Sequence, residues 1–435
     1  MAGTSAAFLF PIELLATLRK TVGANDRINV GLIGCKGMGF ADLTSMLKMS
    51  EVSIIALCDV DENVLQSKTI ELEKAGIKKP KWYRDYRRLL ENKDIDVVII
   101  GTPDHWHCLQ LTEALTAGKD VYCEKPIANS IQEADIMIKY VQSSDRMVQI
   151  GQWQRSQPHF VDAINYVHSG KLGKIRLVKV WAYQGWMGSV PVVPNSPVPQ
   201  GVDYNMWLGP AKQRPFNKNR FHFDFRWFWD YAGGLMTDWG VHLMDYALYG
   251  MKANTPKSVM ALGGKFAYPN DAAETPDTLQ TVYEYDDFSI LWEHATGIDG
   301  GPYGRTHGIA FIGNEGTLVL NRGGWEVIHE NDFNGWGKPG TPRMESIALQ
   351  GNGGISGLDL HTKNFIEAVK SRDNTILTAP IKVGYDAAVV SHMGNVAYKT
   401  GNRIYWDATA NRFKEDEAEA FTKANYHNGW KLPMM

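Results

Sequence analysis

The first third of the chain alternates short apolar runs with longer amphipathic segments. From Arg27 onward the apolar runs are RINVGLIG, VSIIALCD, DVVIIG, DVYCE and MVQIG, nearly continuous as in strands buried on both faces. The segments between them have helical spacing, for example FADLTSMLKM after a glycine-rich turn. This alternation predicts a doubly wound parallel sheet with helices on both faces. We expect the domain to span residues 27–151.

The hydrophobic pattern changes after Gly151. KIRLVKVWAYQ reads as one long strand, and two further segments read as strand pairs that turn at Asp286–Asp287 and Gly313–Gly316. Helical patterns occur at GLMTDWGVHLMDYALYG, at HTKNFIEAVKS and over residues 385–399. Consecutive hairpins predict a C-terminal α+β domain with an antiparallel sheet over residues 152–407, followed by a tail over 408–435. A proline- and aromatic-rich loop over 184–233 is long enough to indicate a functional role.

Composition narrows the functional classes. A chain of 435 residues with 44% hydrophobic and 21% charged residues fits two globular domains. The net charge of −3 provides no basic footprint for nucleic acid or an anionic membrane. Because the four cysteines form no C-x-x-C pair and lie in or beside apolar runs, we expect free thiols, with no disulfide framework and no metal site.

The amino terminus, residues 1–26, has a different character. The run MAGTSAAFLFPIELLA is apolar and rich in small residues but short for a membrane span. It fits an export signal that lacks its basic start, which would make the protein periplasmic. It fits an ordinary amphipathic helix of a cytoplasmic protein equally well. Nothing later in the sequence is long and apolar enough to predict a membrane span.

The first turn, GLIGCKGMGF, predicts a dinucleotide site. Gly34 and Gly39 fit the G-x-G-x-x-G spacing, whereas Lys36 replaces the middle glycine and places a cation near the phosphates. The turn follows a buried strand and begins a helix, where free N–H groups favour a pyrophosphate. We therefore expect Gly34, Cys35, Lys36, Gly37 and Met38 to contact the cofactor.

Asp59 ends the second strand, 20 residues beyond Gly39. A carboxylate at this place binds the adenosine ribose hydroxyls and repels a 2′-phosphate, which favours NAD over NADP. The alternative is a simple turn residue at a strand end.

The motifs TPDHWH and EKP follow the next two strands. Ligands of parallel sheets bind outside the carboxyl ends of the strands, so both motifs face the crevice of the glycine-rich turn. The sequence therefore adds a second group of expected cofactor contacts: Thr102, Pro103, Trp106, His107, Glu124 and Lys125.

GGLMTDWGVHLMDY supplies a carboxylate and an imidazole on one helix face. Asp238 and His242 are spaced i, i+4, and a carboxylate bound to an imidazole raises its basicity. Alternatives are a surface ion pair or a metal site. The flanking apolar residues indicate a buried helix, and no third metal ligand accompanies the pair.

Together these motifs resemble the glucose–fructose oxidoreductase, inositol dehydrogenase and rhizopine-catabolism family, Gfo/Idh/MocA, over about Arg27 to Asp407. EKP and GGLMTDWGVHLMD carry most of the resemblance, and FIGNEGTLVL supports it. The resemblance implies an N-terminal Rossmann domain and a C-terminal domain with a large open, mainly antiparallel sheet that mediates homodimers or homotetramers. It also implies that Lys125, Asp238 and His242 are catalytic. Lys36 departs from the family's glycine fingerprint.

The implied reaction is hydride transfer between NAD and a carbinol carbon of a sugar, glycoside or cyclic polyol. His242 would be the general base, oriented by Asp238, and Lys125 would stabilise the alkoxide. Aromatic faces suit a pyranose, and six of the fourteen tryptophans cluster in one stretch: Trp181, Trp186, Trp207, Trp227, Trp229 and Trp239. At least half of these are expected to build the core or a subunit contact. The expected substrate contacts are Gln154, Arg155, Tyr183, Trp186, Arg305 and His307.

Three other functions remain compatible with the sequence. The protein could cleave glycosides by transient sugar oxidation around a retained NAD. It could be a non-catalytic module that binds a sugar or nucleotide, although binding alone does not need Lys125, Asp238 and His242 together. It could also oxidise a different substrate, such as a biliverdin-like compound or a diol.

Overall fold

A computed structural model gives the structure of the protein and describes residues 27–434. The predicted export signal or leader over residues 1–26 lies outside the described residues. Within the described part, no helix is both long and apolar enough to cross a membrane. In the same part, no group of three or more His, Cys, Asp and Glu side chains could hold a metal ion.

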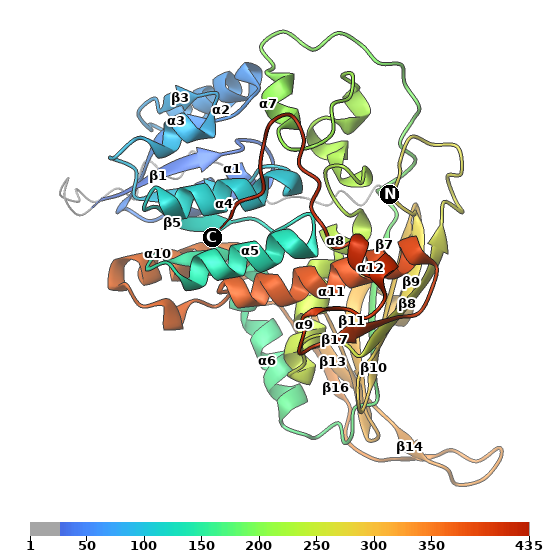
Figure 1. The fold of residues 1–435 in the computed structure, drawn as a ribbon. Coiled ribbons are helices and arrows are strands. Elements are labelled where there is room, and N and C mark those ends of the chain that lie inside the picture. Colours follow the sequence, from blue (N-terminus) through green and yellow to red (C-terminus); the bar gives the residue numbers. More distant parts are fainter. Residues whose placement is uncertain (1–26, 435) are drawn as a thin grey trace.

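The N-terminal domain is the predicted Rossmann domain. Its six parallel strands lie in the order β3-β2-β1-β4-β5-β6 (Figure 1). The strands are β1 (Ile28–Ile33), β2 (Val52–Cys58), β3 (Lys81–Tyr83), β4 (Val97–Ile100), β5 (Asp120–Cys123) and β6 (Val148–Ile150). The helices between them are α1 (Met38–Met46), α2 (Glu62–Lys74), α3 (Tyr86–Leu90), α4 (His107–Thr116) and α5 (Ile131–Gln142). In this domain the sequence analysis missed one strand, the short edge strand β3, because its side chains are mostly exposed and form no apolar run.

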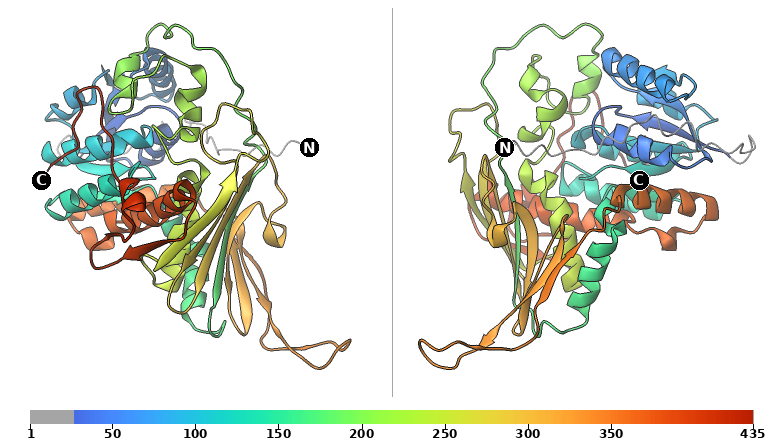
Figure 2. Two further views of the ribbon diagram at one scale, coloured as in Figure 1. Left: turned by 45° about the vertical axis from the view of Figure 1, so that its right-hand side comes forward. Right: turned by 180° about the vertical axis from the view of Figure 1, so that it is seen from behind.

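The C-terminal domain contains a ten-stranded sheet, which confirms the predicted large and mainly antiparallel sheet. Both predicted hairpins form, and the neighbours β7 and β10 are parallel. In spatial order the strands are β16 (Ile347–Gly351), β13 (Gly324–His329), β12 (Gly316–Asn321), β11 (His307–Ile312), β7 (Leu177–Gln184), β10 (Ser289–Thr296), β9 (Thr278–Glu284), β8 (Ser258–Gly264), β17 (Ile404–Asp407) and β18 (Arg412–Phe413). A separate small hairpin, β14 (Asn331–Asp332) with β15 (Thr341–Pro342), projects beyond the sheet (Figure 2).

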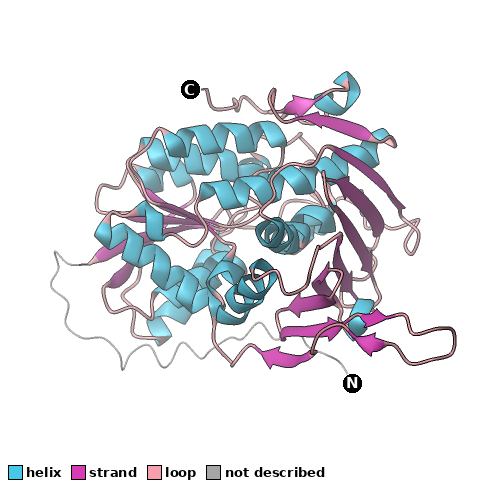
Figure 3. Ribbon diagram, turned by 90° about the horizontal axis from the view of Figure 1, so that it is seen from below, coloured by secondary structure: helices cyan, strands magenta, loops and turns pink. Residues whose placement is uncertain are grey.

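Helices cover one face of this sheet and leave the other face open (Figures 2 and 3). The covering helices are α6 (Pro158–His168), α9 (Gly240–Met251) and α11 (Ile381–Thr400), which contact strands β12, β7 and β8 respectively. On strands β8 and β9, Met260, Leu262 and Val282 are exposed.

Helix α10 (Gly357–Ser371) belongs in sequence to the C-terminal region but packs on the first domain. Ser45 of α1 is hydrogen-bonded to Thr362, and Lys48 forms an ion pair with Asp359. Phe365 of the same helix lies in the apolar core shared with β1 and β2. A helix from beyond the predicted boundary at residue 151 therefore completes the core of the first domain.

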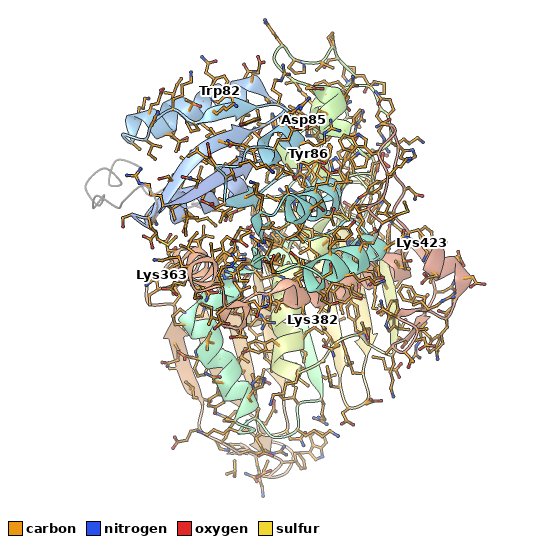
Figure 4. The ribbon with its side chains drawn as sticks, turned by 60° about the vertical axis from the view of Figure 1, so that its left-hand side comes forward. Trp82, Asp85, Tyr86, Lys363, Lys382 and Lys423 are labelled. Carbon is orange, nitrogen blue, oxygen red and sulfur yellow. The ribbon has the colours of Figure 1, made fainter. Side chains whose placement is uncertain are left out.

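The predicted loop folds into a small aromatic subcore against the Rossmann domain. It contains α7 (Tyr204–Leu208) and two 3-10 turns, η5 (Lys218–Arg220) and η6 (His222–Trp227). The C-terminal tail, which includes α12 (Asp416–Ala420), crosses this subcore (Figure 1). The ring of Trp430 in the tail packs edge-on against Trp106, with 4.9 Å between the ring centroids. Tyr86 at the start of α3, labelled in Figure 4, contacts Trp106 edge-on. The loop and tail together cover the carboxyl edge of the parallel sheet.

Candidate functional site

A cavity of about 370 Å³ lies between the carboxyl ends of the Rossmann strands and the loop over residues 185–233. Ten of the twelve expected cofactor residues line it, and the exceptions are Cys35 and His107. The loop contributes Trp207, His222 and Arg226 to the opposite wall. The structure therefore brings the separate strand-end motifs into one site, as expected for a parallel sheet.

The glycine-rich turn has the geometry that phosphate binding requires. Gly34 has φ 85°, and a Cβ on it would lie 2.7 Å from the backbone of Gly101. At Gly37, with φ 56°, an added Cβ would meet no atom within 4 Å, so the backbone faces open space. Because α1 begins at the next residue, this space lies at a helix N-terminus. The turn thus fits a pyrophosphate, and Lys36 lines the same cavity.

Asp59 is fixed by the backbone of the turn. Its carboxylate accepts hydrogen bonds from the N–H groups of Cys35, at 2.8 Å, and Asp61, at 3.0 Å. The carboxylate lines the cavity and retains lone pairs for the ribose hydroxyls of NAD. Burial raises the pKa of Asp59 to about 6, against the lowering effect of these backbone N–H groups.

The position of this pKa gives a pH dependence for cofactor binding. Above about pH 6 Asp59 is ionised and accepts hydrogen bonds; below it the protonated group loses acceptor capacity. We expect the affinity for NAD to fall as the pH is lowered through about 6, measured by calorimetric titration. Asp59→Asn should bind NAD weakly at every pH and lose this titration. An Asp59→Asn protein with unchanged affinity and pH profile would remove Asp59 from the site.

His107 ties two motifs together without lining the cavity. Its Nδ1 is 2.7 Å from the carbonyl oxygen of Pro126, and its Nε2 is 2.8 Å from that of Thr102. The ring therefore joins the TPDHWH turn to EKP. Cys35 contributes its backbone N–H to Asp59, while its thiol is buried against carbonyl oxygens. All four cysteines are free and buried.

Lys125 lies at the end of β5 in a buried ion-pair network. Its ammonium donates to the Asp238 carboxylate at 2.9 Å and to the Asp238 carbonyl oxygen at 3.0 Å. Arg226 binds the other carboxylate oxygen at 2.7 Å. Although burial opposes it, the charges of Arg226 and Lys125 lower the pKa of Asp238 below its usual value. Asp238 is therefore an anion that holds two cations.

The expected contact between Asp238 and His242 is absent from the structure, which corrects the sequence interpretation. The single predicted helix is two helices, α8 (Leu235–Asp238) and α9, which are separated at Trp239. The Asp238 carboxylate instead binds Lys125 and Arg226. Neither ring nitrogen of His242 has a hydrogen bond to a described residue, and its Nδ1 is buried. Burial, with the charges of Lys125 and Arg322, lowers the pKa of His242 well below its usual value, so the ring is neutral.

A cluster of unpaired polar atoms surrounds Trp239. The indole lies 4.8 Å from the ring of His307 and 4.7 Å from the guanidinium of Arg322, which donates to Gln154. Gln152 donates to the carbonyl oxygen of Val241, the residue before His242. The buried atoms without a partner among the described residues are His242 Nδ1, His307 Nε2, Gln152 Oε1, Gln154 Nε2 and Arg322 Nε. Because each such atom costs about 1–3 kcal/mol, the cluster is suited to a hydroxylated ligand.

Of the six expected substrate residues, Gln154 and His307 lie in this cluster. Arg155 is instead paired with Asp245 at 2.5 Å, and Arg305 with Glu326 at 2.5 Å. The Tyr183 hydroxyl donates to Glu293 at 3.2 Å on the large sheet. Trp186 is half-exposed beside Phe223, which lines the cavity. Trp181, Trp207 and Trp227 are buried, in line with the expectation that many tryptophans build the core.

Sequence reasoning missed four residues of the site: Gln152, Trp153, Arg226 and Arg322. Gln152 and Trp153 stand beside the expected Gln154. The position of Gln152 just after β6 was an available signal, since side chains after parallel strands gather at one edge. Arg226 and Arg322 come from a loop and a hairpin turn, where no local pattern marks them.

Comparison with known proteins agrees with this geometry. Residues 28–152 match the oxidoreductase family with the NAD-binding Rossmann fold, and residues 161–294 match the family's C-terminal alpha/beta domain. The chain belongs to the Gfo/Idh/MocA oxidoreductase family. The resemblance found in the sequence is therefore confirmed, and this Gfo/Idh/MocA protein carries an NAD-binding Rossmann domain.

The names of individual relatives of this Gfo/Idh/MocA protein refer to polyols or glycosides. It is 31% identical to an inositol 2-dehydrogenase of Salmonella typhimurium (strain LT2) over 177 residues. These residues are 40% of this chain and 50% of that enzyme. It is 36% identical over 114 residues to a glycosyl hydrolase family 109 protein of Shewanella sp. (strain ANA-3), 25% of each chain. The chain thus spans about half the length of the inositol dehydrogenases it matches.

A levoglucosan dehydrogenase in complex with NADH and levoglucosan has the same fold. Its TM-score is 0.64 at 20% identity, and the superposition covers 87% of this chain and 99% of that chain.

Proposed function

We propose that the protein is an NAD-dependent oxidoreductase that transfers a hydride between the nicotinamide and a secondary hydroxyl of a sugar, glycoside or cyclic polyol. The observation that carries this proposal is the position of Lys125 and Asp238. Both line the cavity that the phosphate turn and Asp59 also line. His242 lies in the first turn of α9, four residues after Asp238, and burial and the Lys125 charge lower the pKa of its ring. A base on α9 and a cation after the carboxyl end of β5 together suit chemistry on a carbinol carbon.

When bound, NAD supplies a nicotinamide C4 that accepts a hydride. The protein must then take the hydroxyl proton and stabilise the developing alkoxide. Neutral His242 is the proton acceptor in this proposal. Lys125 spends two of its three N–H groups on Asp238, and the third is available to the substrate oxygen. Asp238 acts on Lys125, which it positions together with Arg226, rather than on His242.

The unpaired polar atoms around Trp239 support a polyhydroxylated substrate. Gln152, Gln154 and His307 can donate to or accept from hydroxyl groups, and the indole offers an apolar face. The relatives named for inositol and levoglucosan point to the same chemical class. NAD is preferred over NADP because the Asp59 carboxylate would repel a 2′-phosphate.

A second candidate function is glycoside cleavage around a retained NAD. The loop is fastened to the Rossmann domain beside Asp59: Asp203 N–H donates to the Val60 carbonyl at 2.8 Å, and Glu62 N–H donates to the Gly201 carbonyl at 3.0 Å. These contacts, and the tail packed across the loop, would slow release of a bound dinucleotide. The similarity to a glycosyl hydrolase family 109 protein favours the same alternative.

One experiment separates the two functions. The purified protein is supplied with NAD⁺ and a panel of sugars, polyols and aryl glycosides, while NADH and free aryl alcohol are measured together. Stoichiometric NADH accumulation with intact glycosides supports the dehydrogenase. Release of aryl alcohol without NADH in solution would favour the glycoside-cleaving enzyme. Binding of NAD and sugars without either product would leave a non-catalytic module.

The open face of the large sheet supports a homodimer or homotetramer, as the family resemblance implies. Its exposed apolar side chains, including Leu262 at 74% exposure, gain from coverage by a second copy. Sedimentation measures the subunit number directly.

A further inference from the structure

A buried cation that forms no ion pair with any described carboxylate lies beside the proposed substrate site. Arg322 follows β12 in the turn to β13. Its guanidinium lies between two indole rings, 4.9 Å from the centroid of Trp153 and 4.7 Å from that of Trp239. Because Trp239 joins Asp238 to the helix of His242, the guanidinium is held next to the catalytic group.

No described carboxylate lies within ion-pair distance of Arg322. Its Nη2 donates to the amide oxygen of Gln154 at 3.2 Å, and its buried Nε has no partner among residues 27–434. Three other arginines near the site differ, since each has a carboxylate within 2.7 Å: Arg155 with Asp245, Arg226 with Asp238 and Arg305 with Glu326. Burying a charge without an opposite charge beside it is costly, so the missing carboxylate partner of Arg322 needs an explanation.

The charges around Arg322 add to the deficit of anions. Asp238 is the nearby ionised carboxylate, and it already binds Lys125 and Arg226. Burial and the Asp238 charge raise the pKa of Asp104 to about 8, so this neighbour is mostly neutral at pH 7. Burial raises the pKa of Glu124 to about 7, so this carboxyl is only partly ionised. Burial lowers the pKa of Arg322 only to about 10, which leaves it charged, and His307 beside Trp239 is neutral. The substrate end of the site therefore carries excess positive charge.

We propose that the substrate is an acidic sugar, and that Arg322 binds its carboxylate. This inference rests on the proposed function and names the substrate class of that site. A planar guanidinium with an unpaired Nε matches a carboxylate edge-on. The contacts with the two indole rings restrict the Arg322 side chain, so less of its freedom is lost on binding. A neutral sugar would leave the buried cation unpaired.

The test is calorimetric binding of glucuronate and glucose to the NAD-loaded protein. We expect glucuronate to bind about 10–100-fold more tightly than glucose, the range of a charge-assisted hydrogen bond. In Arg322→Met the ratio of the two affinities should fall towards one. Arg322→Lys should restore only part of it, because an ammonium is a point charge rather than a fork. Arg403→Met, which removes a surface cation paired with Glu284, is the matched control and should keep the ratio.

Two results would overturn the inference. Equal binding of glucuronate and glucose, or a preference that survives in Arg322→Met, would show that Arg322 does not select an acid. Tighter binding of glucose 6-phosphate or a sulfated glucose than of glucuronate would assign the cation to a different anion. Hydride transfer is measured separately. Tight glucuronate binding that depends on Arg322 but is not followed by oxidation would contradict the proposed reaction and still support Arg322 as the carboxylate site.

Discussion

His242→Asn is expected to lower kcat by about 10²–10⁴-fold, the usual contribution of a general base. The His242 ring is neutral, its buried Nδ1 has no partner among the described residues, and asparagine cannot take a proton. Because His242 does not line the dinucleotide cavity, the affinity for NAD should change little. Steady-state kinetics and NAD titration on the same preparation check both parts.

The matched control for this substitution is His168→Asn. His168 is partly buried at the end of α6, on a helix that covers the large sheet, and should keep full activity. A His242→Asn enzyme with near-normal kcat and an unchanged pH profile would contradict the role of His242 as base. Loss of kcat with parallel loss of NAD binding would point to misfolding instead.

Lys125→Met is expected to lower kcat by about 10²–10³-fold, as does removal of other groups that stabilise an oxyanion. The substitution removes the N–H group available to the substrate oxygen and leaves Asp238 paired with Arg226 alone. Substrate affinity should fall less than kcat, because the alkoxide charge develops only in the transition state. Kinetics that separate kcat from KM measure this difference.

Lys139→Met is the control for Lys125→Met, since Lys139 is an exposed lysine of α5. It should leave both constants unchanged. If Lys125→Met raised KM alone, Lys125 would be a binding group without a role in the chemical step. If it abolished NAD binding in a folded protein, its function would lie with the cofactor.

Local patterns were sufficient for the Rossmann domain and its turn. Strands buried on both faces appear as apolar runs, and residues after parallel strands must gather at one edge, so Asp59 and Lys125 could be placed from sequence. The turn glycines carry their own signal, because a Cβ at Gly39 would lie 2.4 Å from the Gly34 carbonyl oxygen. The family resemblance then pointed to His242 as the proposed general base.

The remaining site residues depend on contacts that spacing does not reveal. The i, i+4 rule assumed one uninterrupted helix, but α8 ends at Asp238 and α9 begins at Gly240. The Asp238 carboxylate binds Lys125, 113 residues earlier, instead of His242. Arg155 and Arg305 looked available for substrate until the structure showed their carboxylate partners. Arg322 stands in a turn, and only the three-dimensional structure shows that no described carboxylate pairs with it.

The unpaired polar cluster also has an energetic meaning. Five buried atoms without a hydrogen-bond partner in residues 27–434 would together cost several kcal/mol, a large share of the stability of a folded domain. A protein tolerates such a cost where hydrogen bonds to a bound ligand offset it. We therefore expect substrate binding to raise the melting temperature more than NAD binding alone does.

The most direct test of the central claim follows one hydrogen atom. NAD⁺-loaded protein is mixed with a substrate sugar deuterated at the carbon to be oxidised, and the nicotinamide is released and weighed by mass spectrometry. We expect deuterium on the nicotinamide with the wild-type protein and far less with Lys125→Met. This result holds whether or not the cofactor leaves between turnovers. Bound sugar and bound NAD without any transfer of deuterium would contradict it.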